Sequence, residues 1–400
     1  MRQKKSAGNW ALCLATGFCL VSGSANAGLL DAVKSVVPGG ESAPEAAQEK
    51  PAEEKPRDTS KDYNPDGDQV AAAEQYVEVE NAEKLAGIKR VVIPSFMVEF
   101  VTEAKADTRI DGIAMITGAP SNAVVKLVGG NPENFQEITE ILYKQTVEQL
   151  TAAGIEVVPL EQLKANPTFG EIAAKGEKAP REEEAKAGKG VFHSAHGLPL
   201  YYMDEVNFIP RFEIKLFNNK PREDAFLTFG TKFGAGFATA GIPQLEEKLA
   251  KELDATVMKV RLTVMGGMAH VEHSFWTGKT VSVKGAGAFA PLVNRYAFIK
   301  GNGDKSRVSL KTPLTTSEIG QFVDITSAAS KAGDVARNAI TVASRIAPVF
   351  GVRGVDLGYG HSRDYEWRVE PGTFENVIIK YYPGISKMFL AKMRQPAGAK

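Results

Sequence analysis

The sequence predicts an α+β fold in which helices cover a mixed β-sheet. Two apolar runs, 91–101 and 155–159, enclose the clearest amphipathic helix of the chain. Two further runs, 210–217 and 257–265, alternate apolar with charged or polar residues, a spacing typical of β-strands. A strand–helix–strand unit needs a sheet that the helix can cover. The alternating runs indicate that antiparallel hairpins extend this sheet.

The best-defined helix is expected between Asn131 and Gly154. Asn131 can cap it, and Pro132 fits the first helical position, where no backbone donor is needed. Gly154 is a suitable residue to end it. Its apolar residues recur on one face: Phe135, Ile138, Ile141, Leu142 and Leu150. We expect that face to pack on the sheet.

The rest of the chain gives shorter signals. The polar run 168–189 is expected to be a surface excursion, and Gly266-Gly267 to end the strand before it. Pro383-Gly384 is expected to break the last helix, because proline lacks an N–H donor. The remaining predicted elements are a hairpin of 210–217 with 226–233, a helix over 242–253, strands at 280–283 and 293–299, and helices over 335–346 and 374–381.

Residues 1–27 are predicted to be a secretory signal peptide. A positively charged start precedes a short apolar run, and Ala25 and Ala27 supply the small residues that signal peptidase requires for a cut after Ala27. Residues 28–69 are rich in Pro, Ala and Glu, which predicts a flexible linker. The folded region is divided into a first half, 70–190, and a strand-rich second half, 191–400, packed together as one domain. The predicted location is the periplasm, and a peripheral association with the outer membrane is left open.

Charge and cysteine content exclude several functions. Three of the 48 basic residues lie in the signal peptide, which leaves 45 basic against 48 acidic residues, whereas nucleic-acid binders carry a basic excess. Cys13 and Cys19 both lie in the signal peptide, which excludes a cysteine nucleophile or a disulfide bond in the mature chain. No Gly-x-Ser-x-Gly elbow occurs. We therefore expect neither catalytic residues nor a cofactor.

The histidines offer the one candidate site. Four of the five form two His-x-x-His pairs, His193 with His196 and His270 with His273. Neutral imidazoles can bind zinc, copper or nickel. The carboxylates that could join them are Glu272, Asp204 and Glu205. On a strand, however, residues three apart point to opposite faces. We expect local hydrogen bonds, and a metal site is the alternative.

Two separated stretches resemble the TolB amino-terminal-domain-like superfamily. The first is Arg-Val-Val-Ile-Pro-Ser-Phe at 90–96, followed by the helix that ends at Gly154 and by Ile-Glu-Val-Val-Pro-Leu-Glu-Gln-Leu at 155–163. The second is Leu-Ala-Lys-Glu-Leu-Asp-Ala-Thr-Val-Met-Lys-Val at 249–260. Relatives in that superfamily include the curli secretion-channel lipoprotein and lipoprotein activators of peptidoglycan synthases. The resemblance implies a βαβ element and protein binding in the envelope, and it gives no residue a catalytic role. Cys19 follows Thr-Gly-Phe, so the lipid-attachment motif of the curli protein is missing.

The expected function is a non-enzymatic assembly or scaffolding protein of the envelope. It would act through contacts with an unidentified envelope protein, and formation of a homo-oligomer is compatible with this. The first alternative is a metal-binding envelope protein that uses the four paired histidines. The second is an oligomeric, membrane-inserting secretion component with hairpins between Val257 and Ile299. Lys284 to Gly287 interrupts the alternation that a lipid-facing strand needs, which argues against the second alternative.

Overall fold

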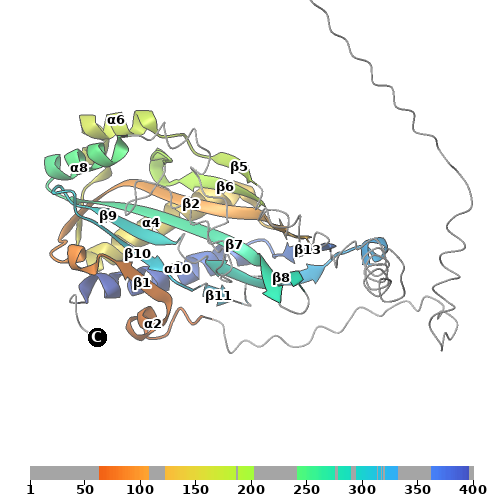
Figure 1. The fold of residues 1–400 in the computed structure, drawn as a ribbon. Helices are drawn as coiled ribbons and strands as arrows, with labels where there is room; N and C mark the ends of the chain where they lie inside the picture. Colours follow the sequence, from red (N-terminus) through yellow and green to blue (C-terminus); the bar gives the residue numbers. More distant parts are fainter. Residues whose placement is uncertain are drawn as a thin grey trace, which may run out of the picture. The chain divides into compact units, whose positions relative to one another are not determined.

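The computed structural model confirms the predicted α+β fold, a mixed sheet with helices packed around it (Figure 1). It describes residues 63–107, 122–185, 188–201, 241–274, 278–289, 294–312, 314–316, 318, 320–331 and 362–395. The predicted signal peptide, the hairpin of 210–217 with 226–233, and the helix over 335–346 lie outside these ranges. None of the described helices is long and apolar enough to cross a membrane.

The centre of the sheet is β2 (Arg90–Asp107), which runs parallel to β7 (Thr256–Ser274) up to Phe100. Both predicted halves of the folded region therefore contribute to one sheet. Antiparallel pairing extends the sheet from these two strands in both directions. Beyond β7 lie β9 (Arg295–Ile299), β10 (Lys305–Leu310) and β1 (Val77–Glu80), and beyond β2 lie β6 (Gly188–Ser194) and β5 (Arg181–Ala185).

Past Phe100 the sheet divides. There β7 leaves β2 and pairs with β8 (Gly278–Phe289), which also pairs with β11 (Leu314–Thr316). The edge of β2 that β7 leaves is taken by β3 (Asn122–Val128). The layer then continues through β13 (Ser362–Arg368), parallel to β3, to β12 (Gln321–Asp324), antiparallel to β13. At its start, β2 also pairs with the short β4 (Glu156–Val157).

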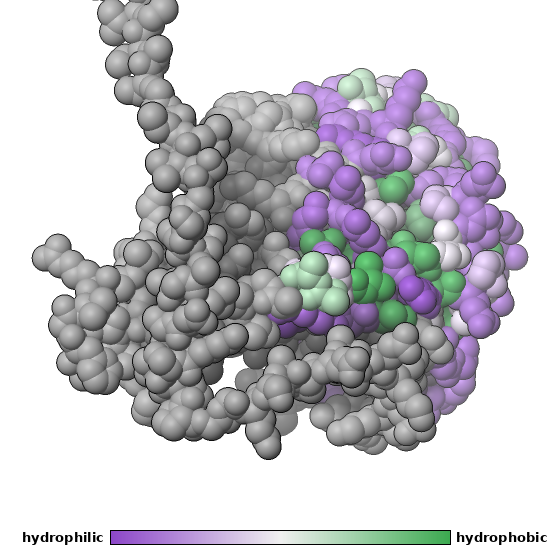
Figure 2. All heavy atoms as spheres, turned by 90° about the vertical axis from the view of Figure 1, so that its right-hand side faces the viewer, coloured by the Kyte–Doolittle hydropathy of each residue, from purple (hydrophilic) through white to green (hydrophobic). Residues whose placement is uncertain are grey.

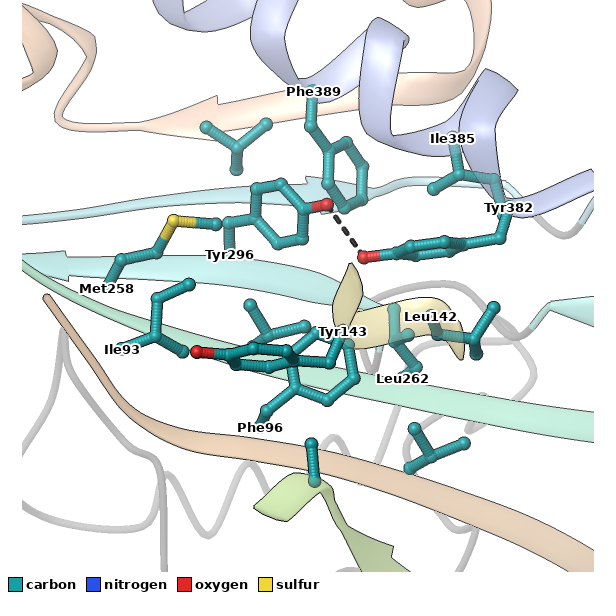
Figure 3. Packing of buried hydrophobic residues seen from close by; sticks show 14 of the residues in the cluster. Ile93, Phe96, Leu142, Tyr143, Met258, Leu262, Tyr296, Tyr382, Ile385 and Phe389 are labelled. Atoms are coloured by element: carbon teal, nitrogen blue, oxygen red, sulfur yellow. Dashed lines mark hydrogen bonds between the residues drawn. The ribbon is translucent and has the colours of Figure 1, made fainter. Parts of the chain in front are cut away.

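Two long helices, α4 (Phe135–Ala152) and α10 (Thr373–Arg394), pack on one face of the sheet. Tyr296 of β9 contacts Phe389 of α10, with ring centroids 4.9 Å apart, and donates to or accepts from the hydroxyl of Tyr382 (Figure 3). Phe100 of β2 stacks on Phe135 of α4 at 4.1 Å. The shorter helices are α2 (Gln69–Tyr76), α5 (Leu160–Ala165), α6 (Pro167–Lys175) and α8 (Ile242–Glu252), with 3-10 turns at Ala82–Leu85, Pro132–Asn134 and Ala195–Gly197.

Several predicted elements are confirmed by these bounds. The strand over 91–101 and the helix over 242–253 correspond to β2 and α8. Asn131 does cap the turn that leads into α4, by accepting a hydrogen bond from the Glu133 amide, and Gly154 follows the helix with φ +71°. Of the five residues on the predicted apolar face, four are buried and Ile141 is half-buried.

The predicted break at Pro383-Gly384 is wrong, because α10 continues to Arg394. Proline removes the donor that would bond to the carbonyl of Ile379, four residues earlier. The side chain of Gln145, on α4, donates to that carbonyl instead, at 3.1 Å. At the next position, a Cβ on Gly384 would collide with the hydroxyl of Tyr63. The dipeptide therefore marks a close contact between α10 and its neighbours.

Four other predictions also need correction. Gly266-Gly267 does not end β7 but accompanies an irregularity in its pairing with β8, the usual role of glycine at a bulge. The run 168–189 is not an excursion, since it holds α6, β5 and the start of β6. The strand over 155–159 is reduced to β4, because α5 begins at Leu160, directly after its N-cap residue Pro159. Packed structure also starts before Val70, since Tyr63 is buried and Asp68 caps α2.

Candidate functional site

His193 is buried between β2 and α4. It lies on β6 opposite Val98, and its ring meets Phe100 and Phe135 edge-on. Its Nδ1 atom is 3.0 Å from the side-chain oxygen of Gln136 on α4. Burial lowers the pKa of the His193 imidazole, because the charged form would lose its hydration. His193 is therefore a neutral packing residue at neutral pH.

His196 is half-exposed and pairs with a carboxylate of α4, the helix that also carries Gln136. Its Nδ1 atom lies 3.0 Å from Oε2 of Glu140, and its backbone amide donates to Oε1 of that residue at 2.8 Å. The ring also meets Tyr143 edge-on, at 4.8 Å between centroids. Since Gln136 donates to Glu140 at 2.7 Å, a continuous polar chain joins His193 to His196. This chain attaches the end of β6 to α4.

The second histidine pair is placed elsewhere. His270 and His273 lie on the part of β7 that has left β2, in register with Ser282 and Lys279 of β8. His193, by contrast, lies on the opposite edge of β2. Among the side chains that the structure describes, no group of three or more His, Cys, Asp or Glu residues is arranged to hold a metal ion. The metal-binding alternative stays a prediction for His270 and His273.

A row of charged side chains crosses the sheet on the face opposite Val260 and Leu262. Alternation along β7 suggests a face open to water, but Lys259, Arg261 and Thr263 are all buried. Arg261 donates to Oε2 of Glu99 on β2 at 3.1 Å, and Thr263 donates to the same oxygen at 2.9 Å. The sequence signal for this pairing was Glu99, a carboxylate inside an otherwise apolar strand.

The same row reaches α8. Lys259 lies 3.0 Å from Oε1 and 3.1 Å from Oε2 of Glu246, whose side chain is fully buried. Tyr201 also donates to Oε1 of Glu246, at 2.9 Å. A buried ion must be matched by an opposite charge or by hydrogen bonds, and here each carboxylate has both. We call Glu99, Glu246, Lys259, Arg261 and Thr263 the buried row; it fixes β2, β7 and α8 relative to one another.

A different charged surface lies on the layer formed by β3, β13 and β12. On its inner face, Ala123, Val125 and Trp367 are buried. The alternate residues form what we call the outer face, on which Val128 and Ile325 are each 41% exposed. The outer face comprises Val124, Lys126 and Val128 of β3, Asp364, Glu366 and Arg368 of β13, and Val323 and Ile325 at β12.

Ion pairs form within the outer face and between it and β2. Arg368 lies 2.8 Å from Glu366, and Lys126 lies 4.0 Å from Glu103 of β2. Lys105, also on β2, lies 2.6 Å from Glu103. Positive and negative residues are thus interleaved with β-branched apolar ones. Where apolar residues reach the described surface they are set among hydrophilic neighbours, as Figure 2 shows for one side of the molecule.

No protein-family model, curated protein or solved structure matches this chain. The resemblance to the TolB amino-terminal superfamily therefore stays a prediction, as does the alternative of a membrane-inserting secretion component. The geometry itself separates two kinds of polar group. The histidine chain and the buried row contact other parts of the same domain. The outer face presents its charges and apolar residues to the surroundings.

Proposed function

We propose that this protein is a non-enzymatic assembly or scaffolding component of the cell envelope that acts through protein contacts on its outer face. The observation that carries the proposal is the exposure of that face, with Val128 and Ile325 each 41% exposed beside Lys126, Glu366 and Arg368. Apolar residues interleaved with charges of both signs are compatible with a protein contact, because a non-obligate interface as a whole is about as polar as the rest of the surface.

The pairing of β3 with β13 supports this proposal. The two strands are parallel, in register from Asn122 with Ser362 to Val128 with Arg368. Sheets made only of parallel strands are covered on both faces, whereas antiparallel sheets can leave one face open, and β3–β13 is a parallel pair within a mixed sheet. Here the inner face is buried, as Val125 and Trp367 show, while the outer face is exposed. The outer face is therefore a sheet surface on which a protein partner could pack.

The buried polar groups suit a rigid support for such a surface. On β7, Arg261 pairs with Glu99 and Lys259 pairs with Glu246. Gln136 and Glu140 hold the end of β6 on α4. β2 contacts β6, β7 and β3. β3 is therefore joined to the rest of the sheet through β2. The predicted signal peptide supports a periplasmic location, with any contact to the outer membrane being peripheral.

Site-specific photo-crosslinking in the cells that make the protein tests this function. A photo-reactive amino acid replaces Val128 or Ile325 in the full chain, and Val70 serves as the control because its side chain is 60% exposed on α2. We expect discrete protein adducts from Val128 and Ile325 and none from Val70. Equal adduct patterns at all three positions, or no adduct at any, would contradict a function through the outer face. Mass spectrometry of the adducts identifies the bound protein.

A further inference from the structure

We propose that the outer face binds the outer face of a second copy of this chain, in a two-fold symmetric contact. This inference rests on the proposed function and specifies the partner. In a two-fold contact the same patch occurs on both sides, so the patch as a whole must be complementary to itself. The register of β3 and β13 allows this requirement to be examined residue by residue.

The outer residues of β3 and β13 form three rows across the two strands. The parallel register sets Val124 beside Asp364, Lys126 beside Glu366, and Val128 beside Arg368. On β3, the first and third rows therefore hold a valine. On β13, the first row holds an acid and the third row holds a base. The middle row consists of one lysine and one glutamate.

An axis that crosses the strands gives complementary contacts in the first and third rows. An axis that crosses the strands at the middle row places the first row of one copy over the third row of the other. Val124 then faces the second copy's Val128, and Asp364 faces its Arg368. An axis along the strands, between β3 and β13, would instead place Val124 over Asp364 and bury a carboxylate against an apolar group, which is unfavourable.

The middle row is compatible with the first arrangement. Lys126 and Glu366 each meet their own counterparts across the axis, but they are neighbours on strands about 4.8 Å apart. Each lysine therefore has a glutamate of the other copy diagonally opposite, within reach of its long side chain. Two sheets packed face to face lie about 10 Å apart, a distance that side chains from both sides fill.

The small size of the patch sets the strength of this association. Three strands, β3, β13 and β12, that each contribute about five residues cover roughly 240 Å² per copy, given strand spacings near 4.8 Å and a rise near 3.3 Å. A standard protein interface buries about 800 Å² on each partner. We therefore expect a weak dimer that forms only as the protein concentration rises. At an envelope surface that concentrates the chain, such contacts would act in assembly.

Charge reversal on β13 tests the arrangement. Each homodimer contains two Asp364–Arg368 contacts, so Arg368→Glu and Asp364→Arg should each prevent self-association by setting like charges opposite one another. A mixture of the two variants should restore it, because every contact then joins one acid to one base. Sedimentation equilibrium of the full exported chain over a wide concentration range measures the average mass. We expect monomers from each variant alone and dimers from the mixture and the wild type.

Recovery in the mixture also shows that both variants are folded. Lys380→Glu is the matched control, because it reverses an exposed charge on α10, away from the outer face, and should leave dimerisation unchanged. A wild-type chain that remains monomeric at all concentrations overturns the inference, as does a mixture that fails to recover the wild-type mass. If photo-crosslinking at Val128 captures a different protein while the wild type stays monomeric, the proposed function is retained and the second-copy contact is wrong.

Discussion

The buried row and the outer face are built from the same kinds of side chain but occupy opposite environments. In the buried row, Arg261 and Glu99 are 3.1 Å apart with side chains at most 3% exposed. On the outer face, Arg368 and Glu366 are 2.8 Å apart with side chains 53% and 25% exposed. The exposed pair is the shorter, yet distance does not decide its contribution. Hydration does, because water screens an exposed pair and cannot reach a buried one.

This difference explains why the two regions can serve different purposes. Removing one member of a buried pair leaves an uncompensated ion inside the protein, so the buried row is tied to the stability of the sheet. An exposed pair contributes little to stability, so its members are free to exchange partners. A protein can therefore vary its outer face for binding while its buried row keeps the scaffold fixed.

The largest effect is expected from Glu99→Ala. The substitution leaves the Arg261 guanidinium buried without this carboxylate and removes an acceptor from Thr263. We expect the free energy of unfolding to fall by about 3–5 kcal/mol. Urea denaturation followed by circular dichroism measures this loss. Replacing both partners, in Glu99→Leu with Arg261→Met, should restore most of it, and a loss below about 1 kcal/mol for the single variant would remove the contrast between the two regions.

A smaller effect is expected from Tyr382→Phe, which changes a buried polar group that carries no charge. The Tyr382 hydroxyl bonds to Tyr296 at 2.8 Å (Figure 3) and also to Thr146 at 2.6 Å. Burial raises the pKa of the Tyr382 hydroxyl, so it stays protonated. Its loss should cost about 1–2 kcal/mol, because two buried hydroxyls lose a partner. Tyr76→Phe on the half-buried α2 is the control and should cost less.

Local patterns in the sequence predicted the helices and strands that are defined by the spacing of apolar residues within one segment. The apolar spacing in α4 and α8 and the apolar run of β2 depend on neighbours a few residues apart, which a sequence displays directly. Pro383 was misinterpreted because its compensation comes from Gln145, on another helix. The parallel pairing of β3 with β13 was not predicted for the same reason, since it joins segments far apart in the chain.

The candidate site shows the same limit. The sequence pattern singled out His193 and His196, and we expected them to form local hydrogen bonds. Their partners Gln136 and Glu140 lie on α4, and no spacing in the sequence relates them to β6. Lys259 and Arg261 suggest a solvent-exposed face of the strand. The alternation of apolar and polar residues, however, shows only that the two faces of a strand differ. Whether the polar face is covered depends on α8 and β2, which only the fold brings together.

An effect of intermediate size concerns His193, and it depends on pH. Burial lowers the pKa of His193 in the folded state, so the unfolded chain, with a value near 6.5, binds the proton more readily. Its contribution to stability is therefore complete above about pH 6.5 and is lost as pH falls, at up to about 1.4 kcal/mol per pH unit. His193→Gln should flatten this decline while keeping a polar partner for Gln136. Urea titrations from pH 7.5 to about 5 compare the slopes, and equal slopes would show that His193 is hydrated.

The smallest effect is expected from Lys126→Ala and Arg368→Ala on the outer face. Both side chains are more than half exposed, at 58% and 53%, so each should change the free energy of unfolding by less than about 1 kcal/mol. The measurement is urea denaturation of dilute, monomeric protein, with added salt to show that any remaining difference is screened. If either variant cost as much as Glu99→Ala, the outer face would be part of the internal charge network. Its residues would then not be free to change partners, and a contact there with a second protein would be wrong.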